Sequence, residues 1–298
     1  MKSLKLAEKR HSVRDYKNKK LNSDDLKTLS LLLLDAPELM NSSGVDFFFV
    51  EEGEIYAPLL ERLAGYNGIM ISAPHYYVLL SDAITNDYKA VGYIGEWFVL
   101  NALKQGIGSC WLEVKDSDKL KSILHIDSPK EAVALLAVGY AQKEHQYSNL
   151  FGKGNKESLF TLAEMGYPNI NTDLSQGPTS YRKSITEFIY MNEWGNTPDI
   201  SDLEQIRLHE ALFYMRLAPS YENRQPWMFV FREDHIDLAI EQHESISPII
   251  RAVDAGIAML YMEVGLHDTG IAGKWQLSVL EPPADIPDGY ELVGQYNF

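Results

Sequence analysis

The sequence predicts an α+β protein made of two similar halves in tandem. Three motifs occur in the same order in both parts of the chain: Arg10–Tyr16 and Arg182–Phe188, Ala36-Pro37 and Ala218-Pro219, and Gly106–Trp111 and Gly270–Trp275. Each part also combines long apolar helices with β-rich apolar runs. We therefore predict a first half at residues 1–143, a linker region at 144–179 and a second half at 180–298.

Length and composition narrow the class of protein. The 298 residues suffice for one large or two moderate domains, and a content of 45% hydrophobic and 23% charged residues is ordinary for a globular protein. A net charge of −15 argues against nucleic acid and anionic membrane surfaces as partners. Cys110 is the single cysteine, which excludes an internal disulfide. We expect a cytoplasmic protein, because no apolar run approaches the roughly 18 residues of a membrane helix and residues 1–10 lack the apolar core of a signal peptide.

Helices and strands alternate through the first half. Asn22 or Ser23 caps a helix whose leucines recur at helical spacing and which ends near Pro37. The later elements are predicted in this order: a buried strand at 47–50, a helix at 56–63, a central strand at 72–80, a helix at 87–105, a helix at 117–124 and a strand at 132–138.

The linker region and the second half continue the pattern. A short helix is predicted at 158–165, between polar stretches rich in Gly, Asn, Ser and Pro. The second half is predicted to contain a helix at 200–217, a buried strand at 228–231, a long apolar helix at 255–268 and a short strand at 290–296.

The loop between residues 217 and 231 contains the most informative polar residues. Ser220, Asn223 and Gln225 are three uncharged hydrogen-bonding side chains that lie between a helix end and an apolar strand. One interpretation is an ordinary turn followed by Trp227 in the core. The other is a loop over a flat polar ligand, with the amides on the ligand's edge and Trp and Pro as a rigid wall.

A local excess of basic residues near the N-terminus allows two interpretations. Arg10, Ser12 and Arg14 alternate, so an extended segment would point all three side chains to one side. Two guanidinium groups and a hydroxyl on one face suit a phosphate and a polyol. The alternative is a solvated basic tail.

The glycine-bearing stretch Gly106–Trp111 follows the long helix of the first half. It is too short for a dinucleotide-binding fingerprint and does not follow a strand. Glycines in this place usually end a helix. Cys110 in this stretch is expected to be a small buried residue and not a nucleophile.

Together these motifs resemble the nitroreductase family of FMN enzymes. The resemblance rests on Arg-x-Ser-x-Arg-x-Tyr at 10–16, Gly-x-Gly-Ser-x-Trp at 106–111 and Ala-Pro-Ser-x-x-Asn-x-Gln-Pro-Trp at 218–227. It covers roughly residues 8–143 and 180–298. It implies a nitroreductase-like fold, in which two helix-plus-antiparallel-sheet halves form an intramolecular pseudo-dimer, and it makes a monomer the expected state.

The resemblance also implies one complete FMN site composed of residues from both halves. Its expected cofactor contacts are Arg10, His11, Ser12, Arg14, Gly108, Ser109, Lys143, Pro219, Ser220, Tyr221 and Asn223. A second site would combine Arg182, Ser184, Thr186 and Gly273 with Pro37, Glu38 and Asn41. That site lacks an arginine at Thr186 and has a carboxylate at Glu38, so we expect one FMN per chain.

By the same resemblance, the expected activity is NAD(P)H-driven reduction of a small aromatic or quinone-like acceptor. A backbone N–H of the glycine stretch is expected near flavin N5, and Arg10 or Arg14 near the N1/O2 edge. No side chain is expected to act as a catalytic acid, base or nucleophile, and no metal is expected. Two alternatives are a non-catalytic FMN-binding or sensor protein and a degenerate homologue without flavin.

Overall fold

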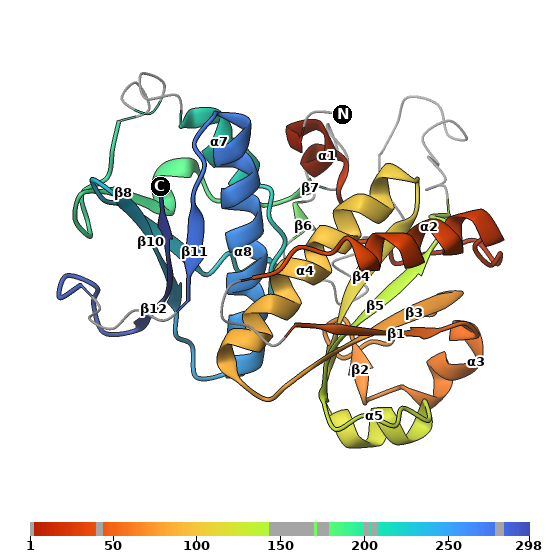
Figure 1. Cartoon of the computed structure of the whole chain (residues 1–298). Coiled ribbons are helices and arrows are strands. Elements are labelled where there is room, and N and C mark those ends of the chain that lie inside the picture. The colour runs from red at the N-terminus through yellow and green to blue at the C-terminus, as the bar shows by residue number, and fades with distance from the viewer. Residues whose placement is uncertain are drawn as a thin grey trace, which may run out of the picture.

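Two five-stranded sheets flank a pair of long helices. The computed structural model describes residues 3–39, 44–142, 170–171, 179–199, 203, 208–277 and 283–298. Within these residues the long helices α4 (Thr85–Lys104) and α8 (Pro248–Asp268) pack against each other between the two sheets (Figure 1). The fold is therefore α+β, as the sequence predicts.

The first sheet is antiparallel throughout and is covered on both faces. It contains β1 (Asp46–Val50), β2 (Ala64–Gly65), β3 (His75–Ser81), β4 (Gly108–Val114) and β5 (Glu131–Gly139) in the order β1-β3-β5-β4-β2. Tyr77 and Leu79 of β3 pack with α2 (Ser23–Leu34) and α4. Tyr76 and Val78 pack on the other face with α5 (Ser117–Ile123). This double covering explains why all seven residues of β3 are buried.

The second sheet repeats most of this topology. It contains β8 (Ile189–Met191), β9 (Trp227–Phe231), β10 (His235–Glu241), β11 (Lys274–Gln276) and β12 (Tyr290–Asn297) in the order β11-β12-β10-β9-β8. Strands β9, β10, β12 and β11 therefore follow the order of β1, β3, β5 and β4, with the same antiparallel pairing. A register shift occurs at Leu79/Leu80 and at the corresponding place, Leu238/Ala239. The parallel pairing of β8 with β9 has no counterpart in the first sheet.

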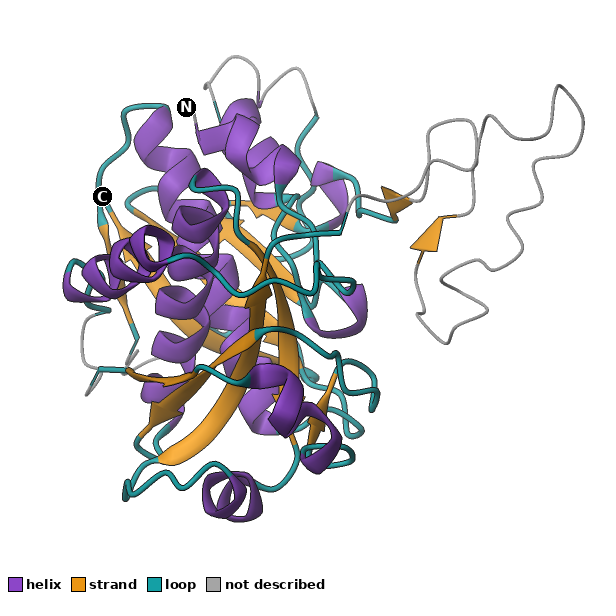
Figure 2. Ribbon diagram, turned by 90° about the vertical axis from the view of Figure 1, so that its right-hand side faces the viewer, coloured by secondary structure: helices purple, strands orange, loops and turns teal. Residues whose placement is uncertain are grey.

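Short elements complete the described chain. They are α1 (Ser3–Lys9), α3 (Gly53–Tyr56), α7 (His209–Met215), the 3-10 turns η1 (Ala57–Leu59), η3 (Ile185–Glu187) and η4 (Tyr221–Asn223), and the paired strands β6 (Ile170–Asn171) and β7 (Thr179–Ser180). The view turned by 90° shows the helices packed around the strands (Figure 2). None of the described helices is both long and apolar enough to span a membrane.

The two long helices cross at a glycine on each. A Cβ atom at Gly92 would lie 1.9 Å from the carbonyl oxygen of Val253, and one at Gly256 would lie 1.8 Å from that of Lys89. Only a residue without a side chain permits such close backbone contact. The reciprocal pattern also shows that Gly92 and Gly256 are equivalent positions in the two halves.

Several sequence predictions are confirmed at the level of single residues. Asn22 Oδ1 accepts a hydrogen bond from Asp25 N at 2.8 Å, so α2 begins at the predicted cap. Helix α4 lies within two residues of its predicted start. Helix α8 starts seven residues before the predicted Ala255, because Ser247 caps it and Pro248 fits its first turn.

Other predictions are wrong or fall outside the described residues. The helix predicted at 56–63 is replaced by α3 and η1, because Pro58 has no backbone donor to continue an α-helix. Strand β1 is half-buried at the edge of its sheet and is not the fully buried strand predicted. The helix predicted at 158–165 lies outside the described residues, and of the one at 200–217 the structure describes mainly α7.

Seven of the described strands were not predicted. Strand β4 occupies most of the stretch interpreted as a glycine turn, and β2, β6, β7, β8, β10 and β11 were also missed. Gly106 does end α4, with a φ of +76°. Gly108 serves a different purpose, because a Cβ there would lie 2.6 Å from Val13 Cγ2. Its missing side chain lets the N-terminal segment approach β4.

Candidate functional site

The basic segment Arg10–Tyr16 lies on the first sheet and is not a solvated tail. Ser12 forms a parallel bridge with Ser109, and Val13 N donates to Ser109 O at 2.8 Å. Farther along, Tyr16 forms an antiparallel bridge with Ala141. The structure therefore brings two groups of predicted site residues together, those of the basic segment and those at the start of β4.

Arg10 points into the protein and binds a buried carboxylate. Its Nε lies 2.9 Å from Glu96 Oε1 and its Nη2 lies 3.3 Å from Glu96 Oε2, and the two side chains are 4% and 0% exposed. Burial lowers the pKa of Arg10, but the charge and hydrogen bond of Glu96, together with Tyr261 and Cys110, raise it above its usual value. The remaining Nη1 faces Ser12 Oγ at 3.4 Å.

Glu96 is the centre of a buried hydrogen-bond network that sequence reasoning missed. Besides Arg10, it accepts hydrogen bonds from Trp111 Nε1 at 2.7 Å and from the Tyr261 hydroxyl at 3.1 Å. Tyr261 belongs to α8, so the network joins the two halves. A lone acid in the apolar part of a predicted helix is a signal that could have identified it, because a buried carboxylate requires partners.

Arg14, two residues after Ser12, lies against an aromatic ring. Its guanidinium carbon is 4.4 Å from the centroid of the Tyr66 ring, a cation–π contact. The next residue, Asn67, has a φ of +49°, and both polar atoms of its amide are buried without a hydrogen-bond partner in the described structure. A buried amide of this kind is available to a planar polar ligand.

The second half contributes the loop at 218–226. Tyr221 N donates to the carboxylate of Asp254 on α8, at 3.0 Å from Oδ1 and 3.3 Å from Oδ2. Asn223 Nδ2 donates to Tyr181 O at 2.6 Å, and Gln225 N donates to Ser220 Oγ at 2.8 Å. The loop is therefore fixed from within its own half.

Gln225 and Trp227 are structural residues. Gln225 is 2% exposed, its Oε1 accepts from Lys183 N at 2.9 Å, and its Nε2 donates to Tyr181 O at 3.2 Å. Trp227 is fully buried in the core that surrounds α8. Of the two interpretations of this tryptophan, the core residue is correct and the ligand wall is wrong.

The loop faces the first half across a small group of polar side chains. Burial raises the pKa of the Tyr221 hydroxyl to about 12, and Glu113, Glu222, Asp254 and Tyr66 act in the same direction. Burial also raises the pKa of Glu113, with a further contribution from Glu222. Glu113 and Tyr66 belong to the first half, so the predicted contact Tyr221 lies within electrostatic range of first-half residues that were not predicted.

The other predicted site residues are placed as follows. His11 is exposed, and its Nδ1 is 3.0 Å from Lys9 O. Gly108 and Ser109 are buried at the start of β4, whereas Pro219 and Ser220 are half-buried. Cys110 is buried, and burial raises its pKa, as expected of an unreactive thiol. Lys143 lies outside the described residues.

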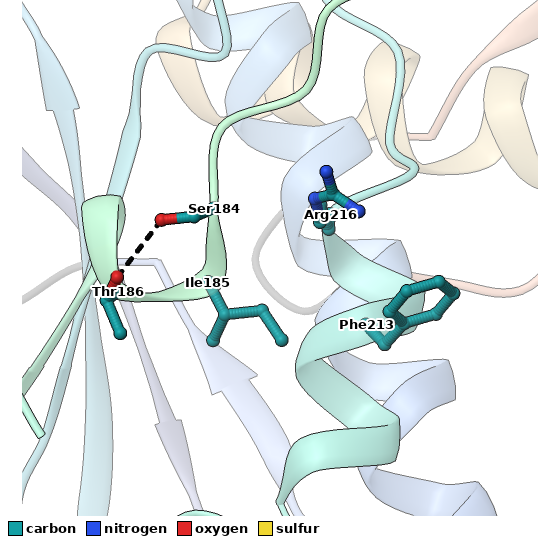
Figure 3. Close-up of a pocket in the computed structure, with 5 residues that line it drawn as sticks. All are labelled: Ser184, Ile185, Thr186, Phe213 and Arg216. Carbon is teal, nitrogen blue, oxygen red and sulfur yellow. Dashed lines mark hydrogen bonds between the residues drawn. The ribbon is translucent and has the colours of Figure 1, made fainter. Parts of the chain in front are cut away.

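The corresponding region of the second half is different. Arg182 Nη1 donates to Ala218 O at 2.6 Å, and burial together with the charge of Arg10 lowers its pKa to about 10. A cavity of about 200 Å³ is lined by Ser184, Ile185, Thr186, Phe213 and Arg216. In it the hydroxyls of Ser184 and Thr186 face each other at 3.0 Å, while Ile185 points towards the helix that carries Phe213 and Arg216 (Figure 3).

This second region has fewer groups that could hold an anion. Thr186 stands where the first half has Arg14, and Arg216 already donates Nε to Lys183 O at 2.8 Å. Counting from the crossing glycines, Leu260 corresponds to Glu96. Asn41, which was expected to complete this region, lies outside the described residues.

Comparison with known proteins gives a family and a fold. The family model described as "Putative TM nitroreductase" matches residues 3–266. A solved structure from Thermotoga maritima MSB8, described as a "putative nitroreductase", has 18% identity and a TM-score of 0.59, and the match covers 100% of this chain and 94% of that chain. No curated protein matches the sequence.

Smaller solved proteins match about half of the chain. An FMN-dependent nitroreductase from Clostridium difficile R20291 has 20% identity and a TM-score of 0.41, and the match covers 50% of this chain and 98% of that chain. A nitroreductase with bound FMN from Bacteroides fragilis NCTC 9343 also has 20% identity and a TM-score of 0.41, and the match covers 54% of this chain and 98% of that chain.

Proposed function

The chain belongs to the nitroreductase family, and we propose that it is an FMN-dependent oxidoreductase that uses NAD(P)H to reduce a small aromatic or quinone-like acceptor. We place the reaction at one composite FMN site between the halves. The observation that supports this most strongly is the interaction of Tyr221, in the 219–223 loop of the second half, with Tyr66 of the first half, whose ring contacts Arg14. The bridge between Ser12 and Ser109 joins further family-like residues of the first half.

The residues of this region suit the cofactor. The guanidinium of Arg14 on the Tyr66 ring offers positive charge to a phosphate or to an electron-rich ring edge. The unpartnered amide of Asn67 offers a donor and an acceptor to a planar polar edge. Gly108 leaves room for close backbone approach. A bound FMN would supply the electron-transfer chemistry.

Six of the predicted contacts have a proposed task. Arg14 would bind the anionic part of the cofactor, with Lys143 as a second cation. Ser12, Ser220 and Asn223 would hydrogen-bond its polyol chain and ring edge. Arg10 would act mainly by orienting Ser12, because Glu96 already neutralises its charge and its free Nη1 faces that hydroxyl.

We propose that the equivalent region of the second half holds no flavin. Thr186 occupies the position equivalent to Arg14, and the cavity that it lines also contains the apolar side chains of Ile185 and Phe213. A fused chain with one site needs no second copy to complete it, so we propose a monomer. One FMN per chain is then the expected stoichiometry.

The test is the visible spectrum and the FMN-to-protein ratio of gently purified protein, before and after reconstitution with FMN. We expect a ratio near one, bleaching by NAD(P)H without oxygen, and recovery of colour on adding a nitroaromatic or a quinone. A ratio near two, or one near zero that FMN does not restore, would contradict the single site. Stable colour that NAD(P)H does not bleach would favour the FMN-binding sensor.

The two halves provide a matched pair of variants. Arg14→Ala is expected to abolish FMN retention, whereas Thr186→Ala changes the corresponding position of the other half and should leave it intact. Equal losses from both variants would refute the assignment of the cofactor to the first region. Equal FMN retention by both variants would show that Arg14 does not bind the cofactor.

A further inference from the structure

A buried carboxylate on α8 holds the loop that the second half contributes to the site. Asp254 is 4% exposed, and its two oxygens accept from the single backbone donor Tyr221 N at 3.0 and 3.3 Å. This contact fixes the loop at the residue after Ser220. The proposed function uses the side chains on both sides of that point, Ser220 and Asn223, but gives no role to Asp254.

The loop adopts a conformation that needs such a restraint. Glu222, Asn223 and Gln225 all have left-handed backbones, with φ values of +50°, +55° and +53°. Residues other than glycine rarely adopt this region, and clusters of them persist only where surrounding contacts enforce them. The Asp254 contact is made immediately before the first of these residues.

The helix position that carries Asp254 differs between the two halves. Counting from the equivalent glycines Gly92 and Gly256, the position of Asp254 corresponds to Ala90 on α4. The side chain of alanine has no hydrogen-bond acceptor, so α4 offers no carboxylate at the position equivalent to Asp254.

The charge of Asp254 is sensitive to pH in the neutral range. Burial raises its pKa to about 7, against the lowering effects of the Tyr221 N–H and of Arg224. On the loop side it faces Tyr221, whose hydroxyl also interacts with Glu222 and with Glu113 of β4.

The facing helix α4 supplies one cation near the crossing. Lys89 is buried there, donates Nζ to Val293 O at 2.6 Å, and has its pKa lowered to about 8 by burial. The ammonium group of Lys89 is therefore already hydrogen-bonded to a backbone carbonyl. Arg224 is the cation that acts on Asp254.

We propose that Asp254 is a positioning residue that holds the 219–223 loop in its flavin-binding conformation and makes FMN binding dependent on pH. The inference rests on the proposed function, because it assumes that this loop contacts the flavin. FMN carries an anionic phosphate, so an ionised Asp254 adds a like charge next to the loop that contacts the cofactor and opposes binding. FMN affinity therefore decreases as pH increases through neutrality.

The experiment measures the dissociation constant of FMN from apoprotein by flavin fluorescence between pH 6.0 and pH 8.5. If FMN binding raises the pKa of Asp254 by one unit, the wild-type constant increases by about tenfold over the titration. Asp254→Asn keeps an acceptor for Tyr221 N but cannot ionise. It is expected to keep the tight low-pH affinity of the wild type at every pH.

Two further variants separate positioning from charge. Asp254→Ala removes the acceptor and is expected to weaken FMN binding at every pH, including pH 6.0. Glu263→Gln is the matched control, because Glu263 is a partly buried acid on the same helix whose pKa is also raised by burial. It should keep the wild-type pH dependence. The titration of the FMN phosphate itself is common to all variants and cancels in the comparison.

The outcomes are distinct. The inference is overturned if Asp254→Asn retains the wild-type pH dependence, or if folded Asp254→Ala binds FMN as well as the wild type does. If Asp254→Ala does not fold, as judged by circular dichroism, the pH profile of Asp254→Asn alone decides. Failure of the wild type to bind FMN at any pH would overturn the proposed function, and the inference with it.

Discussion

Replacing Glu96 by glutamine is expected to destabilise the protein strongly. The Glu96 carboxylate is fully buried and faces an Arg10 side chain that is 4% exposed, with two nitrogen–oxygen contacts of 2.9 and 3.3 Å. Glutamine is nearly isosteric, but it removes the negative charge and turns an NH₂ group towards a guanidinium. Removing one partner of a buried ion pair costs about 3–5 kcal/mol, since the other charge stays buried without compensation.

Urea unfolding of the apoprotein, followed by tryptophan fluorescence and circular dichroism, measures this change. Asp46→Asn is the control, because Asp46 is 61% exposed and its contact with Lys130 Nζ at 3.1 Å lies at the surface. That variant should lose less than about 1 kcal/mol. A loss for Glu96→Gln no larger than that of the control would refute the view that Glu96 compensates the charge of Arg10.

A double variant tests the pair as a unit. Glu96→Leu introduces the residue that the other half has at Leu260, and Arg10→Met removes the cation. Because an apolar pair of similar volume can replace a buried ion pair at little cost, the double variant should lose clearly less than the sum of the single losses. Additive losses would show that Trp111 and Tyr261, and not Arg10, account for the role of Glu96.

Three other predictions concern single positions. Arg14→Ala should release FMN while Thr186→Ala retains it, as measured by the absorbance of the purified proteins. Gly92→Ala should lower the free energy of unfolding in urea by at least about 1–3 kcal/mol, because the new Cβ would lie 1.9 Å from a carbonyl oxygen at the helix crossing. Gly270→Ala is the control, because that position has open space but a φ of +90°. It should lower the free energy of unfolding by only about 1 kcal/mol. Burial raises the pKa of Asp254 to about 7, so the folded state keeps a proton that the unfolded chain releases near pH 4. Unfolding free energy should therefore fall between about pH 4 and pH 7, by at most roughly 4 kcal/mol, and this fall should be absent in Asp254→Asn. Equal slopes for both proteins would contradict the assignment.

Local signals predicted much of the fold. The Asn22 cap, the long apolar helices and the repeated motifs are encoded within short stretches, so they could be read without knowing the tertiary contacts. Strand β10 was missed because its pattern contains His235 and Asp237, which look like surface residues. In the structure Asp237 is fully buried and accepts from Arg232 Nε at 2.9 Å. Because Arg232 pairs with it, this charged residue lies in the interior and not at the surface.

The candidate site was predictable only in part, for a related reason. Ser12 and Ser109, which lie in contact, both belong to motifs that can be recognised in the sequence. The pairing of Arg10 with Glu96 joins residues 86 positions apart, and no local pattern indicates it. Asp254 is a lone acid in an apolar helix, and only its hydrogen bond with Tyr221 N indicates that it holds the loop.

The Glu96 network also gives a physical reason why a fused chain differs from a symmetric dimer. Glu96 reaches across to Tyr261 on the opposite helix, so it lies close to the axis that relates the two halves. In a homodimer every residue near the axis occurs twice, so a second carboxylate would stand near the first. Each of these carboxylates would need its own buried arginine, because a buried charge requires a partner. With Leu260 at the equivalent position, this chain contains one such buried pair, Glu96 with Arg10, where a homodimer would contain two.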